Sequence, residues 1–246
     1  MGRGERRLLC RRSEGGDTPH EKMSDTGRDA FSQLLYPMLS PQPSASAAVL
    51  EELAVAPRDK SAESNRLRER MLAESEDEIV ACGMAMAARF AAGGRLLCCG
   101  NGGSATAASD MVAEFLLPPA GHRPIPALSL TNDVAVVTAV ANDVSFDDVF
   151  LRQVIALGRP GDVVVGVSTS GNSENILRGS REAHRRGMLT VGIAGYDGGK
   201  MARDATLDHC FVVRSSSVHR IQEVQTTLYH ILWELVQRNM EEPACA

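Results

Sequence analysis

The chain has 246 residues, of which 43% are hydrophobic and 4% aromatic, and its formal net charge is -5 at pH 7. This composition argues against a nucleic-acid partner, because nucleic-acid-binding proteins are usually basic and often stack bases on aromatic side chains. It also argues against a membrane protein, since no apolar run approaches the roughly 20 residues that a membrane-spanning helix needs. The six cysteines contain no CxxC pair and are too few for a disulfide scaffold, which favours a reducing, cytoplasmic location.

The first part of the chain differs from the rest, because it begins with many arginines and continues rich in Pro, Ser and Ala. We expect residues 1–60 to be a weakly ordered extension with one short helix at 45–54, and residues 61–242 to form the folded domain. An arginine-rich start resembles an organelle transit peptide, but the acidic residues among these arginines weaken that interpretation. A start codon placed too far upstream, with the true start near Met23 or Met38, is the alternative.

From residue 64 onward the hydrophobic pattern becomes regular. Helical spacing of apolar residues predicts a long helix over 64–92, ended by two glycines, and a final helix over 219–240. Between these helices, short apolar runs alternate with segments of helical spacing. Near-continuous apolar runs are typical of parallel strands buried on both faces, so we predict an α/β fold with helices on both sides of a parallel sheet. The predicted strands are 95–99, 125–130, 162–167, 189–194 and 209–213.

The loop after the first predicted strand is rich in glycine. Residues 100–105 read Gly-Asn-Gly-Gly-Ser-Ala and open a helix, which partly matches the GxGxxG/A fingerprint of dinucleotide-binding folds. That fingerprint also needs an acidic residue at the end of the second strand to bind the ribose. Residues 128–131 read Leu-Ser-Leu-Thr at that place. We therefore expect no nucleotide cofactor.

The loop after the third predicted strand is rich in hydroxyl groups. Residues 168–173 read Ser-Thr-Ser-Gly-Asn-Ser and again open a helix. A single serine there would be an ordinary helix cap. Four hydroxyls together with the free N–H groups and the positive dipole end of a helix form a suitable binding site for a phosphate monoester. The second loop therefore predicts phosphate binding.

Together, the two loops resemble the paired signatures of sugar isomerase (SIS) domains, and more narrowly those of the sedoheptulose 7-phosphate isomerase (phosphoheptose isomerase) family. Residues 141–143, 195–201 and 220–223 support the resemblance, which covers about 64–240. The resemblance implies a flavodoxin-like, three-layer α/β sandwich around a five-stranded parallel sheet, with long helices at both ends. It also implies a homotetramer whose active sites lie between subunits.

The resemblance further implies which residues form the site. Glu114 would be the catalytic carboxylate, with His230 as its partner and Gln222 beside them. The positions that would bind the phosphate or the rest of the sugar are Asn101, Gly102, Gly103, Ser104, Asn142, Asp143, Ser168, Thr169, Ser170, Ser173 and Gln222.

The residues themselves also support Glu114 and His230 as acid–base candidates. Glu114 has apolar neighbours on the helix that the glycine loop opens, and a partly buried carboxylate near a phosphate is a suitable general base. A solvated surface acid is the alternative for Glu114, and a packed core histidine is the alternative for His230. Gln222 falls about 80° from His230 around the final helix, on nearly the same face.

Two positions depart from the family pattern. Zinc-binding members have a histidine where this chain has Asp110, so Asp110, Glu114, Gln222 and His230 form a candidate set for one divalent ion, with zinc ahead of manganese. A family aspartate that helps to handle the sugar is His219 here. These changes leave the metal and the substrate preference open.

The expected function is an aldose–ketose isomerase that converts D-sedoheptulose 7-phosphate to D-glycero-D-manno-heptose 7-phosphate through an enediol, for nucleotide-activated heptose biosynthesis. The alternative is a non-catalytic SIS-domain regulator that binds a sugar phosphate or a protein of the replication-initiator type. The presence of Glu114 and His230 argues against the regulator.

Overall fold

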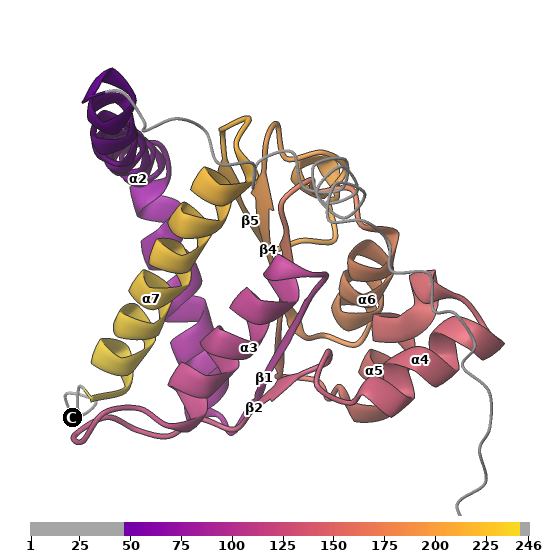
Figure 1. Cartoon of the computed structure of the whole chain (residues 1–246). Helices are drawn as coiled ribbons and strands as arrows, with labels where there is room; N and C mark the ends of the chain where they lie inside the picture. The colour runs from indigo at the N-terminus through magenta and orange to yellow at the C-terminus, as the bar shows by residue number, and fades with distance from the viewer. Residues whose placement is uncertain (1–46, 242–246) are drawn as a thin grey trace, which may run out of the picture. The chain divides into compact units, whose positions relative to one another are not determined.

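The computed structural model describes residues 47–241 of the chain, with side chains described from 57 to 240. The chain divides into two compact units, Met1–Leu53 and Ala54–Ala246, and the sheet lies in the second. None of the helices in the described range is long and apolar enough to cross a bilayer. Figure 1 shows the elements in order: α2 (Ala47–Ala91), β1 (Leu96–Gly100), α3 (Gly103–Leu116), β2 (Ala127–Ser129), α4 (Val134–Asp143), η2 (Phe146–Asp148), α5 (Val149–Leu157), β3 (Val163–Ser168), α6 (Glu174–Arg185), β4 (Leu189–Gly195), η3 (Met201–Arg203), β5 (His209–Val213) and α7 (Val218–Glu241).

The predicted five-stranded parallel sheet is confirmed, with the strand order β2-β1-β3-β4-β5. In the register of the three neighbouring strands, Cys98 of β1 lies opposite Ser129 of β2 and Val165 of β3. Strand β2 is an edge strand and is shorter than the predicted run 125–130. Pro126 has no N–H group to give to a strand ladder, which is a physical reason for its late start.

Helices cover both faces of the sheet, so the predicted three-layer sandwich is also confirmed (Figure 1). Alternate residues along a strand point to opposite faces. Accordingly, Cys98 and Val165 belong to a core that includes buried residues of α2, α3 and α7. Leu97 and Val164 belong to a second core, which packs against α4, α5 and α6.

The long first helix begins earlier than predicted. Helix α2 starts at Ala47 instead of Ser64 and contains Pro57 in its interior. Residues 47–60, which we expected to be weakly ordered apart from a short helix, are therefore helical. Their composition includes Ala, Leu and Glu, which are strong helix formers. The expectations for residues 1–46 lie outside the described residues.

The strand order brings the two candidate loops together. Strands β1 and β3 are neighbours, but α3, which follows β1, packs in the first core, whereas α6, which follows β3, packs in the second. Where two adjacent parallel strands lead to helices on opposite faces, a crevice forms at their carboxyl ends, and ligands of doubly wound folds bind there. Both candidate loops begin at this crevice.

Candidate active site

A reciprocal pair of hydrogen bonds joins the glycine loop to the hydroxyl loop. The amide of Asn101, after β1, and the amide of Asn175, in the first turn of α6, exchange bonds of 3.0 and 2.9 Å. We predicted that Asn101 binds substrate, and in this structure its side chain holds the two loops together. Sequence reasoning missed Asn175, although an amide two residues past the last hydroxyl of a loop is a visible signal.

The glycine loop approaches α7 closely. A Cβ atom at Gly103 would lie 2.2 Å from Nε2 of Gln222, so the backbone reaches this side chain only because residue 103 is glycine. Gly102 precedes α3 with a φ of 55°, in the left-handed region that favours glycine. Ser104 follows and is 4% exposed. The fold thus places Gln222 at the start of α3.

The hydroxyl loop surrounds an uncapped helix start. The Ser168 and Ser173 hydroxyl oxygens are 3.1 Å apart, and Ser168 Oγ accepts a hydrogen bond from Gly171 N at 3.1 Å. Ser170 Oγ accepts one from Asn172 N at 3.2 Å. Helix α6 begins without a side-chain cap. Ile176 N is bonded to Asn175 Oδ1 and Ser173 O, whereas none of the described loop or side-chain hydrogen bonds uses the N–H groups of Glu174 and Asn175. These two groups and the positive end of the helix dipole are therefore available to an anion.

The loop after β4 forms hydrogen bonds with the hydroxyl loop. Met201 N donates to Gly171 O at 2.9 Å, and Lys200 N donates to Asn172 Oδ1 at 3.0 Å. Gly171 has a φ of 63°, and a Cβ atom there would lie 2.1 Å from the carbonyl oxygen of Gly198. This contact leaves no room for a side chain at position 171.

Glu114 and His230 lie in contact. His230 Nε2, on α7, is 3.1 Å from Glu114 Oε1, on α3, and the two side chains are 46% and 31% exposed. The other oxygen, Glu114 Oε2, is buried without a hydrogen-bond partner among the described residues. Burial raises the pKa of Glu114, the nearby His230 lowers it and the charge of Asp110 raises it, with a net upward shift. The arrangement provides a carboxylate that accepts a proton readily and an imidazole beside it.

Within one chain, Gln222 does not lie beside this pair. Gln222 and His230 are eight residues apart on α7, which corresponds to about 12 Å along the helix axis. The two residues lie at similar angles around α7, but two helical turns separate their side chains. For the same reason, Glu114 lies about 15 Å along α3 from Ser104.

The four-residue metal set is not assembled within one chain. Tyr229 donates a hydrogen bond to Asp110 Oδ2 at 2.5 Å, and Gln222 is too far along α7 to share an ion with His230. Across the described part of the chain, no group of three or more His, Cys, Asp or Glu side chains is placed to hold a metal ion.

Sequence reasoning missed Tyr229, whose pKa rises above its usual range through burial and through its bond to Asp110.

Two predicted substrate-binding residues, and one residue that differs from the family pattern, are exposed. Asn142 and Asp143 end α4, where Asn142 Nδ2 donates to Asp143 Oδ1 at 2.8 Å. Among the described hydrogen bonds, none joins this pair to the two loops. His219 is exposed at the start of α7.

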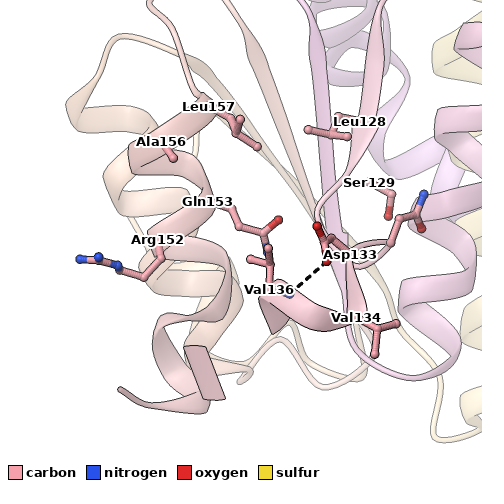
Figure 2. A pocket seen from close by; sticks show the side chains of 10 residues that line it. Leu128, Ser129, Asp133, Val134, Val136, Arg152, Gln153, Ala156 and Leu157 are labelled. Atoms are coloured by element: carbon pink, nitrogen blue, oxygen red, sulfur yellow. Dashed lines mark hydrogen bonds between the residues drawn. The ribbon is translucent and has the colours of Figure 1, made fainter. Parts of the chain in front are cut away.

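A groove of about 900 Å³ lies apart from these residues, between the end of β2, α4 and α5. Figure 2 shows Leu128 and Leu157 pointing toward one another across it. At its floor, Asp133 Oδ1 accepts a hydrogen bond from Val136 N at 3.0 Å and so caps α4. None of the predicted site residues lines this groove.

The fold and the site define a class: a doubly wound α/β protein whose crevice is lined by a glycine loop and a hydroxyl loop, with a carboxylate–imidazole pair. The chain belongs to the SIS-domain family, whose model matches residues 61–195. It is 46% identical over 183 residues to the phosphoheptose isomerase of Desulfovibrio desulfuricans, covering 74% of this chain and 86% of that protein. The solved phosphoheptose isomerase of Neisseria gonorrhoeae has a TM-score of 0.68 and 37% identity over 77% of this chain and 99% of that one. For the enzyme of Francisella tularensis the TM-score is 0.64 and the identity 31%, over 74% and 98% of the chains.

Proposed function

We propose that this chain is an aldose–ketose isomerase that converts D-sedoheptulose 7-phosphate to D-glycero-D-manno-heptose 7-phosphate, for nucleotide-activated heptose biosynthesis. The observation that carries the proposal is the 3.1 Å contact between Glu114 and His230, in a chain 46% identical to a phosphoheptose isomerase. A protein that only binds a sugar phosphate has no use for a proton-transfer pair. The regulator alternative is therefore not favoured.

The reaction moves one proton between carbon atoms and one between oxygen atoms. The Glu114 carboxylate takes a proton from C1 of the open-chain ketose, the C–H electrons form the C1=C2 bond, and the C2 oxygen takes up a proton to give the enediol. Glu114 then returns its proton to C2 while the C1 hydroxyl loses its own proton, which leaves an aldehyde at C1. We assign to His230 the transfer of the proton between the two oxygens.

The assay that tests the proposal is turnover of a panel of five-, six- and seven-carbon ketose phosphates, each with zinc, with manganese and with a chelator. We expect turnover of sedoheptulose 7-phosphate with the highest kcat/KM of the panel. A purified, folded chain that fails to turn over this sugar under all three conditions contradicts the proposal.

Ser170→Ala tests the phosphate site. The hydroxyl accepts a bond from Asn172 N, so its proton is left to donate to a phosphate oxygen, and hydrogen bonds to charged groups contribute about 1.5–3 kcal/mol. We expect KM to rise about tenfold or more while kcat changes little. Ser75→Ala on α2 is the control and should leave both constants unchanged. A large loss of kcat at unchanged KM would mean that Ser170 does not act through binding.

The raised pKa of Glu114 predicts the acid side of the pH profile. A general base works as the carboxylate, so kcat/KM should fall with decreasing pH at a higher pH than for an ordinary glutamate, whose pKa is about 4.3. Asp110→Asn removes a negative charge that raises the pKa of Glu114. We therefore expect this limb of the profile to move to lower pH. Asp147→Asn, at a surface ion pair on η2, is the control, and an unmoved limb in Asp110→Asn would contradict the assignment.

We also propose that the chain forms a homotetramer with sites between subunits. Helix α4 is apolar, yet none of its residues is buried within the described chain, and Val134 is 68% exposed. His230 is 46% exposed, whereas an enediol intermediate needs protection from water; a second copy could supply that cover. Light scattering after gel filtration should give about four times the chain mass, and a monomer at all concentrations would contradict the assembly.

A bound zinc ion stays a prediction of the resemblance, and no step of the reaction is assigned to it because the donor set does not fit in one chain. The sugar phosphate needs no nucleotide cofactor in the proposed reaction. The cytoplasmic location also stays a prediction. In the described part, Cys82, Cys98, Cys99 and Cys210 are free thiols, as a reducing compartment would keep them.

A further inference from the structure

Two hydrogen bonds between α3 and α7 play no part in the proton transfers. Tyr229 donates from its hydroxyl to Asp110 Oδ2 at 2.5 Å. Trp233 donates from its indole N–H to the backbone oxygen of Glu114 at 3.2 Å. Asp110 is one helical turn before Glu114, and Trp233 is about one turn after His230. The two bonds therefore flank the Glu114–His230 contact along the same pair of helices.

Tyr229 is well placed to hold this interface in register. It is 1% exposed and belongs to the core that α2, α3 and α7 share. Its ring packs edge-on against the ring of His230, with centroids 4.8 Å apart. The one side chain thus fixes Asp110 through its hydroxyl and restrains His230 through its ring.

We infer that Tyr229 and Asp110 form an interhelical clasp that positions Glu114 against His230, and that Asp110 is not a metal ligand in this chain. A slip of one residue along a helix moves its side chains by about 1.5 Å, which is enough to break a contact of hydrogen-bond length. Two helices that carry one half each of a catalytic pair therefore need a fixed register. The clasp supplies it close to the reacting atoms.

The Asp110 carboxylate already has a hydrogen-bond partner. Its Oδ2 receives the phenol proton of a buried tyrosine, and Gln222 lies against Gly103, two turns of α7 away from His230. Within one chain, the carboxylate thus has a structural partner and lacks the converging donors that an ion would need. The positioning half rests on the proposed isomerase, whereas the metal half does not.

Tyr229→Phe tests the positioning half, because it removes one oxygen atom and keeps the ring. We expect kcat to fall about tenfold while KM stays within about twofold. Thr190→Val is the matched control: it removes a buried hydroxyl that bonds Thr206 O and Asp208 at the far end of β4, so it should lower the melting temperature without changing kcat. An unchanged kcat in Tyr229→Phe overturns the clasp.

A second readout needs no substrate. Ring-proton NMR of His230, assigned by loss of its signal in His230→Gln, should show a shift in Tyr229→Phe and none in Thr190→Val, because the Glu114 contact changes only in the first. An unmoved His230 signal in Tyr229→Phe overturns the positioning role even if the protein proves to be no isomerase. If the unchanged chain shows no turnover but Tyr229→Phe still shifts the His230 signal, the result counts against the proposed function and leaves the positioning role standing.

Equilibrium dialysis with zinc, and separately with manganese, tests the metal half. We expect the dissociation constant of the unchanged chain and that of Asp110→Ala to agree within about threefold. Asp110 is exposed, so its truncation should leave the fold intact, which a thermal melt checks. A tenfold or greater loss of affinity in Asp110→Ala overturns the inference, because it would make the carboxylate a ligand.

Discussion

Glu114→Gln is expected to lower kcat for sedoheptulose 7-phosphate by about 10³-fold, within the range for loss of a general base. The amide has the size of the carboxylate and can still contact His230, but it cannot take a proton from carbon. The dissociation constant of the sugar phosphate should therefore stay within about threefold. Quantifying the product in reactions quenched at fixed times gives kcat. Isothermal titration calorimetry of the inactive variant gives the dissociation constant.

The control for this variant is Glu234→Gln, at an exposed position on α7 that pairs with Arg238. Surface pairs of this kind contribute little, so both kcat and binding should be unchanged. A Glu114→Gln chain with undiminished kcat would remove Glu114 from the mechanism. A variant that loses binding and turnover together would place Glu114 in substrate binding instead.

Gly171→Ala is expected to damage both stability and substrate binding. Its φ of 63° and the 2.1 Å approach to Gly198 O act together, and the clash is with backbone that cannot rotate away. Backbone strain of this type costs about 1–3 kcal/mol, and the clash adds to it, so we expect the free energy of unfolding to fall by about 3 kcal/mol or more. Since the hydroxyl loop must move, KM should rise as well. Urea denaturation and steady-state kinetics give the two values.

Gly187→Ala separates the two causes. Gly187 has a similar φ of 75° but no atom within 4 Å of a Cβ atom, so only the strain applies and the loss should be about 1 kcal/mol. KM should be unchanged because Gly187 lies outside the site loops. Equal losses of stability in the two variants would show that the contact with Gly198 does not matter.

The elements of the sheet were predictable because each depends on a local pattern. Strand β5 was predicted at its observed bounds, and β1, β3 and β4 within one residue at either end. Strand β2 was overextended because the apolar run continues beyond it: Ile125 N bonds Phe115 O of α3 instead of β1, and Leu130 N still bonds Cys98 O of β1 but lies just past the end of the strand. The start of α2 was missed because Pro57 and its polar surroundings resemble a linker.

The site was predictable only in part, for a physical reason. The hydroxyl loop and the glycine loop have a local chemistry that can be read from consecutive residues. The partners of Asp110 and Asn101 lie more than 70 positions away along the chain. No local pattern therefore indicates which residues pair, although the Asn175 amide itself is visible beside the hydroxyl loop. The angle of Gln222 around α7 did not show its separation from His230 within one chain, because that separation depends on the distance along the helix axis.

The reciprocal amide pair of Asn101 and Asn175 has a consequence for protein engineering. Because each amide satisfies the other, the two loops form one unit although 74 positions separate the asparagines. A loop transplanted from another sugar-phosphate protein would leave a polar group without its partner unless both loops were exchanged. Redesign of the specificity of this crevice therefore has to treat residues 100–105 and 168–175 as a single module.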